Sequence, residues 1–157
     1  MKLIVGTDGS RGSRAALRFA ARMAKGCRQT QIVVVTIGAL RRQLLFAHPE
    51  TPAGLSLWPE LEKRERALAK RVLAEAARDV TKLGVTVRCR FVQPRRLGPV
   101  AEAIAQEADK EKADLIVVGT EGHGGAGSWS LGSVSARLLH IAQRPVAVVR
   151  VPRLKAK

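Results

Sequence analysis

Aromatic and acidic residues are both scarce in this sequence. Aromatic side chains make up 3% of the 157 residues, and 13 Asp and Glu stand against 28 Lys and Arg, for a formal net charge of +15. Few aromatic side chains means few stacking platforms for single-stranded nucleic acid. The positive charge nevertheless attracts polyanions and favours solubility. Composition therefore leaves two interpretations open: a solvated basic surface, or a module that binds RNA or DNA.

Metal-ligand clusters and membrane spans are also missing from the sequence. The cysteines form no C-x-x-C pair and the histidines lie at no spacing typical of a metal site; these residues are Cys27, Cys89, His48, His123 and His140. We therefore expect reduced thiols that fill apolar sites, and no protein-only transition-metal site. No apolar run reaches about 18 residues, which argues against a membrane span. The N-terminal segment meets an acidic turn too early for a signal peptide, so we expect a cytoplasmic protein.

What the sequence does contain is a regular alternation of strand-like and helix-like segments. Hydrophobic residues make up 46% of the chain, which suits a globular core, and the length favours one domain. We expect that domain to span residues 1–152, followed by a basic tail at 153–157. The expected strands are 3–5, 31–37, 85–91, 114–120 and 146–151. The first expected helix is capped by Ser10 or Ser13 and ended by Gly26, and the other expected helices are 60–83, 100–112 and 134–143.

This alternation predicts a doubly wound α/β fold: a five-stranded parallel sheet with helices on both faces. The segments 3–5, 31–37 and 115–118 are almost wholly apolar, as strands buried on both faces are. In the segment 85–91, apolar residues alternate with Thr and Arg, which indicates an edge strand with one wet face. The predicted strand order is therefore 3-2-1-4-5.

Two stretches of the middle region behave differently. Gly38 to Pro59 shows no sustained period and is predicted to be a surface loop, with one short helix near 41–46. The segment 60–83 has the longest helical pattern. Its expected buried face consists of Leu61, Leu68, Val72, Ala76, Val80 and Leu83.

A glycine-rich loop, 119–133, joins the fourth strand to the last helix. Glycines let backbone N–H groups approach an anion closely, and the first turn of a helix adds unpaired N–H groups and the positive end of its dipole. The hydroxyl of Ser133 suits either an N-cap or a phosphate ligand. Ligands in doubly wound sheets bind at the switch point, here between the first and fourth strands. The loop therefore predicts a nucleotide phosphate site beside the turn after the first strand.

Two common phosphate motifs do not match. No glycine precedes Lys-Ser or Lys-Thr as in a Walker A loop, and the turn from Gly6 to Gly12 departs from G-x-G-x-x-G. Asp8 in that turn would repel phosphate, yet it could accept a ribose hydroxyl or bind Mg²⁺. It could equally serve the turn itself and the dipole of the first helix.

The glycine spacing resembles a known family signature. Gly119-x-x-Gly122, nine residues, then Gly132-Ser133 is similar to the nucleotide-binding signature of the universal stress protein family. The segments 5–10, 114–119 and 145–150 agree with that family in order, so the resemblance covers essentially the whole chain.

The resemblance implies an ATP-binding regulatory module of the stress response, without efficient catalysis. By this likeness Asp8 would contact ribose or Mg²⁺, with Thr7 beside it, and the Ile37 backbone would meet adenine. Gly119 and Gly122 would pass under the ribose and phosphates, and phosphate oxygens would be held at Gly132, Ser133 and Val134. Members of the family typically form homodimers through the last strand, here 146–151.

Two residues of the loop qualify this expectation. Glu121 places a carboxylate where family members usually have a basic or neutral side chain, and it would weaken phosphate binding unless it points away or shares Mg²⁺. His123 has no visible orienting partner, which favours a solvent-facing histidine over a general base. With no nucleophile–base pair in the sequence, we expect a protein that is not an enzyme, with slow ATP hydrolysis at most.

Overall fold

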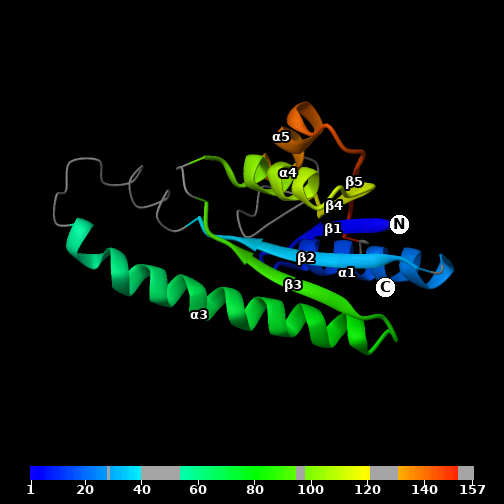
Figure 1. The fold of residues 1–157 in the computed structure, drawn as a ribbon, viewed down its shortest axis with the longest axis horizontal. Helices are drawn as coiled ribbons and strands as arrows, with labels where there is room; N and C mark the ends of the chain where they lie inside the picture. The colour runs from blue at the N-terminus through cyan, green and yellow to red at the C-terminus, as the bar shows by residue number, and fades with distance from the viewer. Residues whose placement is uncertain (28, 40–53, 95–97, 121–130, 152–157) are drawn as a thin grey trace, which may run out of the picture.

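A computed structural model describes residues 1–27, 29–39, 54–94, 98–120 and 131–151. These residues form five strands and four helices (Figure 1). The strands are β1 (Lys2–Gly6), β2 (Gln31–Ile37), β3 (Val87–Val92), β4 (Leu115–Gly119) and β5 (Val146–Val149). The helices are α1 (Arg11–Gly26), α3 (Gly54–Thr81), α4 (Val100–Lys110) and α5 (Ser133–Ile141).

The strands form one parallel sheet in the order β3-β2-β1-β4-β5, which confirms the predicted fold and strand order. Val5 in the central strand pairs with Val34 of β2 on one side and Val117 of β4 on the other. The alternating strand β3 lies at an edge, as its pattern predicts: Arg88 and Arg90 are exposed, while its apolar residues pack on the core. Strand periodicity thus located this edge correctly.

Helices cover both faces of the sheet. Helices α1 and α3 pack on one face over a core that includes Leu3, Val5 and Val34, and α4 and α5 pack on the other over Ile4 and Val33 (Figure 1). Neighbouring residues of β1 enter opposite cores because successive side chains of a strand point to opposite faces. Both faces of the central strands are therefore buried, which explains why their sequences are almost wholly apolar.

The longest helix corrects two predictions. Helix α3 begins at Gly54, so the last six residues of the predicted 38–59 loop are helical and Pro59 lies inside the helix. Proline removes one i→i−4 hydrogen bond, a small loss near the start of a 28-residue helix. Leu68, predicted to be buried, is 61% exposed. The segment 40–53, including the short helix expected at 41–46, lies outside the described residues.

The residues of α3 that face the core only partly match the predicted set, which was right for Ala76 and Val80 and missed Ala69 and Leu73. Its most buried residues are Ala69, Leu73, Ala76 and Val80. They follow one another at helical intervals and form one stripe, which excludes Leu68. Two residues of this stripe, Ala69 and Ala76, are small, so the leucine side chains alone were a poor guide to the buried face of α3.

Several element ends fall one or two residues from their predicted positions. Helix α4 ends at Lys110 rather than at residue 112, with Glu111 as its C-cap, and α5 runs over 133–141 rather than 134–143. Strand β3 starts at Val87 rather than at 85, and β5 ends at Val149 rather than at 151. In the described part of the chain, none of the helices has the length and apolar character that crossing a bilayer requires.

Candidate functional site

Three segments meet at the carboxyl ends of the two central strands. The turn after β1 and the end of β4 are neighbours because β1 and β4 pair directly. The start of α5 is tied to the same place, since Gly132 N donates to the Thr120 carbonyl at 2.6 Å. The strand order reverses between β1 and β4, so this is the switch point at which doubly wound sheets bind ligands.

The turn after β1 is organised by short polar side chains. Asp8 Oδ1 accepts the Ser10 N–H at 2.9 Å, and Gly9 takes a φ of +82°, a conformation that favours glycine. Ser10 is the N-cap of α1, with its hydroxyl accepting the Ser13 N–H at 3.2 Å. Asp8 thus has the turn-stabilising role that was one of its two interpretations. Its exposed side chain lies at the carboxyl edge of the sheet.

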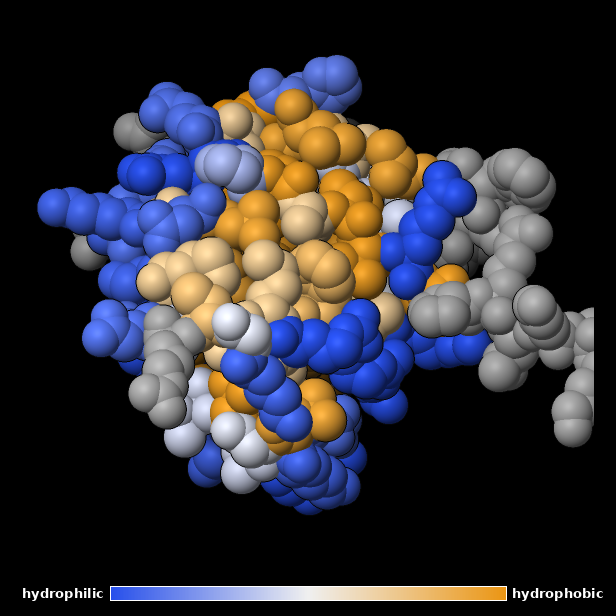
Figure 2. All heavy atoms as spheres, turned by 90° about the vertical axis from the view of Figure 1, so that its right-hand side faces the viewer, coloured by the Kyte–Doolittle hydropathy of each residue, from blue (hydrophilic) through white to orange (hydrophobic). Residues whose placement is uncertain are grey.

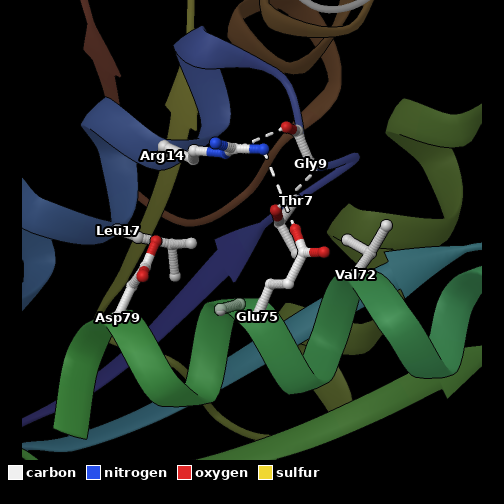
Figure 3. Close-up of a pocket in the computed structure, with 8 residues that line it drawn as sticks. Thr7, Gly9, Arg14, Leu17, Val72, Glu75 and Asp79 are labelled. Carbon is white, nitrogen blue, oxygen red and sulfur yellow. Dashed lines mark hydrogen bonds and ion pairs between the residues drawn. The ribbon is translucent and has the colours of Figure 1, made fainter.

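Thr7, the residue before Asp8, has its side chain turned into the protein. Its side chain is buried, and its Oγ1 donates to Ser13 Oγ at 3.1 Å and accepts the Gly9 N–H at 3.3 Å (Figure 3). Its carbonyl accepts the Thr36 hydroxyl at 2.9 Å. The polar atoms of Thr7 are therefore occupied: the hydroxyl bonds to Ser13 and Gly9, and the backbone bonds to β2.

A close approach between α1 and β4 explains the glycine at position 119. A Cβ at Gly119 would lie 2.6 Å from the carbonyl oxygen of Gly12, in the first turn of α1. The absence of a side chain at position 119 therefore lets the helix start pack tightly against the strand end. Sequence reasoning missed Gly12, whose one available signal was a glycine placed just inside a helix start.

The start of α5 corrects one interpretation of Ser133. Gly132 is the N-cap and Ser133 is already the first helical residue, because the Gly132 carbonyl accepts the Ala136 N–H and the Ser135 hydroxyl, both at 2.9 Å. The Ser133 side chain is exposed. Within the described residues, no acceptor takes the N–H groups of Ser133, Val134 or Ser135. The helix therefore presents three donors and a hydroxyl at its positive end.

The remaining predicted positions are distributed around this centre. Ile37 ends β2 and is half-buried, and the next residue, Gly38, donates its N–H to the Val92 carbonyl at 2.8 Å. Gly122 and Glu121 lie outside the described residues. Among the residues that the structure describes, no three His, Cys, Asp or Glu side chains gather as a metal site. Any Mg²⁺ held here would need oxygen ligands from a phosphate in addition to Asp8.

A small, shallow hollow lies beside the turn after β1, between α1 and α3 (Figure 3). Arg14 spans it: Nε donates to the Gly9 carbonyl at 3.1 Å, and Nη2 lies 3.8 Å from Glu75 Oε2. Leu17, Val72, Ala76 and Asp79 complete its wall, with Thr7. The ion pair between Arg14 and Glu75 crosses this hollow, and the bond from Arg14 to Gly9 supports the turn after β1 from the side of α1 and α3.

Comparison with known proteins agrees with this geometry. The universal stress protein family matches residues 1–150. A universal stress protein of Methanocaldococcus jannaschii is 32% identical over 154 residues, covering 97% of this chain and 83% of that protein. A universal stress protein solved in complex with cAMP superimposes with a TM-score of 0.64 at 25% identity, covering 97% of this chain and 98% of the other. The Archaeoglobus fulgidus protein in complex with dAMP gives a TM-score of 0.64 at 23% identity, covering 95% of this chain and 97% of the other. The chain belongs to the universal stress protein family.

Proposed function

We propose that this protein binds adenine nucleotides, ATP with Mg²⁺ foremost, at the carboxyl ends of β1 and β4, and that it serves as a regulatory module of the stress response. The observation that carries the proposal is the start of α5, where the N–H groups of Ser133, Val134 and Ser135 have no acceptor among the described residues beside an exposed hydroxyl. Such a helix start favours a phosphate. The known cAMP and dAMP complexes of two relatives support an adenine nucleotide.

Within this proposal the residues have distinct tasks. The α5 start holds phosphate oxygens through backbone N–H groups and the Ser133 hydroxyl. Asp8, held by its bond to Ser10 N, accepts a ribose hydroxyl or shares Mg²⁺ with the phosphates. The Ile37 backbone at the end of β2 borders the adenine. Gly119 and Gly122 leave room for the ribose and phosphates, and at Gly119 the glycine also lets α1 pack on β4.

The same site supports binding without efficient chemistry. In the described part of the crevice, Asp8 supplies the carboxylate of the turn after β1. No basic side chain among the described residues is hydrogen-bonded to the Ser133 hydroxyl. A serine nucleophile needs such a base. Slow hydrolysis by water would need only positioning of the phosphates, and we propose that any ATPase activity is of this kind.

Isothermal titration calorimetry tests the proposal directly. We expect ATP to bind the nucleotide-free protein with a dissociation constant in the micromolar range, and Asp8→Asn to reduce the dependence of that affinity on Mg²⁺. The matched control is Asp114→Asn, because Asp114 is an exposed carboxylate that accepts the Lys2 N–H at the opposite end of the sheet. Absence of heat at millimolar ATP, with and without Mg²⁺, would reject the nucleotide site.

We further propose a homodimer that pairs through the outer edge of β5, within the predicted 146–151 segment. The four residues of this edge strand are all only half-buried in the single chain. An edge strand offers unpaired N–H and C=O groups, which antiparallel pairing with a second copy would satisfy. Sedimentation equilibrium should then give twice the chain mass of 16.9 kDa. A monomer mass at concentrations above about 100 µM, where weak dimers also form, would contradict it.

The broad apolar area drawn in Figure 2 lies on a different side of the protein from the nucleotide site. That face is the right-hand side of Figure 1, where the strands begin, whereas the nucleotide site lies at the strands' carboxyl ends. The proposed nucleotide site and this apolar area therefore need not compete for the same surface.

A further inference from the structure

Helix α1 carries positive charge without any negative charge. Its sixteen residues include no Asp or Glu, and its cations are Arg11, Arg14, Arg18, Arg22 and Lys25, all exposed. Intervals of three and four residues place these side chains on one face of the helix. The opposite face, which includes Ala16, Leu17 and Ala20, is buried in the core. The positions 11 to 25 span about 21 Å along the helix axis.

This stripe of cations contradicts the local rules of helix stability. Arg11 stands in the first turn, near the positive end of the helix dipole, where a carboxylate would be favourable and none is present. Arg14, Arg18 and Arg22 follow one another at i,i+4, so each repels the next. Folding alone gives no reason to keep this arrangement. Departures from local rules that bring no structural gain are expected at functional surfaces.

Elsewhere in the described residues, many cations are neutralised. On the other side of the sheet, Arg90 lies 3.2 Å from the buried Glu107 and 2.8 Å from Glu111, which also pairs with Arg88 and Lys2. Burial opposes ionisation of Glu111, but hydrogen bonds and attraction from Arg88, with Lys2 and Arg90, hold the pKa of this carboxyl below its usual value. The helices α4 and α5 are linked by a further pair, Arg137 with Glu102.

Within the part of the chain that the structure describes, a carboxylate neutralises helix α1 at one position only. Arg14 is bound to the Gly9 carbonyl and to Glu75 of the neighbouring helix α3 (Figure 3). No carboxylate in the described residues lies within 4.0 Å of the cationic groups of the other four, Arg11, Arg18, Arg22 and Lys25. We call these four residues the α1 cationic face.

The chemistry of this face selects the class of partner. Three of its four cations are arginines, whose planar guanidinium groups bind phosphate oxygens in pairs. An amphipathic helix on a membrane surface buries its apolar face in lipid, whereas the apolar face of α1 is already used in the core. The cationic face itself contains no aromatic side chain that could stack on a base. Contacts to a nucleic-acid backbone, without reading of the bases, fit all three facts.

We propose that the α1 cationic face binds the phosphate backbone of double-stranded nucleic acid independently of base sequence. This interaction is separate from the nucleotide site and does not require it. Four cations that each neutralise one phosphate predict that log K falls with log salt concentration with a slope of about −3.6. Affinity should therefore be measurable at low salt and should fall steeply as salt is added.

Fluorescence anisotropy with a labelled 30-base-pair DNA duplex and an RNA duplex of equal length tests this. For Arg18→Gln/Arg22→Gln we expect at least a tenfold loss of affinity at 50 mM KCl and a slope less steep by about 1.8. The control, Lys63→Gln/Lys112→Gln, removes the same charge at two exposed positions outside α1 and should change affinity less than about threefold, since only general attraction is reduced. Gln is a good helix former at positions 18, 22 and 63, and Lys112 is an exposed residue beyond the end of α4. Circular dichroism and ATP titration of both variants should therefore match the wild type.

Several results would overturn the proposal. Undetectable binding to both duplexes at the lowest salt would do so, and so would equal losses in the two double variants. Competition by ATP beyond its effect on ionic strength would assign the duplex to the nucleotide site instead. Binding to vesicles that contain phosphatidylserine, with no binding to either duplex, would show that the face recognises membrane headgroups.

Discussion

Replacing Gly132 by aspartate is expected to raise the dissociation constant for ATP by at least about 100-fold, a loss of about 2.7 kcal/mol. The new carboxylate would stand at the N-cap of α5, next to the N–H groups that we propose for phosphate. Two like charges about 4 Å apart in a partly exposed site repel by roughly 4 kcal/mol. The aspartate would also accept the same helix N–H groups that the phosphate needs.

The fold should survive this substitution. Gly132 has a φ of −61°, which any residue adopts, and aspartate is a favoured N-cap. The added Cβ would lie 2.8 Å from the Thr120 carbonyl oxygen, a backbone atom, so the start of α5 must shift away from the end of β4. Thermal unfolding followed by circular dichroism checks that the variant is folded, and calorimetry measures its ATP affinity.

Gln143→Asp is the matched control for this experiment. It changes the net charge by the same amount at an exposed position beyond the other end of α5. We expect its ATP affinity to stay within about twofold of the wild type, because exposed charges separated by more than about 10 Å are largely screened. Equal ATP affinity in Gly132→Asp and the wild type would show that phosphate does not bind at the start of this helix.

Replacing Gly119 by alanine is expected to destabilise the fold by about 2–3 kcal/mol. The new methyl group would lie 2.6 Å from the Gly12 carbonyl oxygen, which belongs to the backbone of α1 and cannot rotate away like a side chain. Relief requires that α1 move as a whole off β4. For a chain of this size, the melting temperature should fall by roughly 4–12 °C.

Gly26→Ala is the matched control for Gly119→Ala. It adds the same methyl group to a glycine of α1, but no atom lies within 4 Å of the added Cβ. Alanine there restricts the unfolded chain, so we expect stabilisation by about 0.4–1 kcal/mol. Urea denaturation of both variants gives the two free energies of unfolding. If Gly119→Ala unfolds at the wild-type urea concentration, the tight packing of α1 against β4 is not a feature of the protein in solution.

Local sequence patterns were enough to predict most of the sheet. The runs around Val5, Val34 and Val117 are apolar because each strand is covered on both faces, and the alternation around Arg88 and Arg90 marks the wet face of an edge. These patterns follow directly from the period of two in a strand. This burial pattern fitted the doubly wound order 3-2-1-4-5, with the alternating strand at one edge.

The ends of the helices were harder to predict from local sequence patterns. Proline and glycine in the segment 38–59 indicated a loop, yet α3 begins at Gly54 and passes through Pro59. Tertiary packing of a long helix overrides a weak local signal. Leu68 was assigned to the core for its hydrophobicity, although the helical angle of α3 directs Ala69 and Leu73 inward instead.

By itself, the sequence determined the fold class, the strand order and the region of the candidate site, because strand burial and glycine spacing are local properties of the chain. Only the tertiary structure decided what each residue there does. It placed Gly12 against Gly119, used the Thr7 hydroxyl within the turn, and made Gly132 rather than Ser133 the N-cap of α5. It also separated the paired cations of β3 and α4 from the cationic face of α1. Such relations depend on which segments meet in space, and no local pattern encodes that.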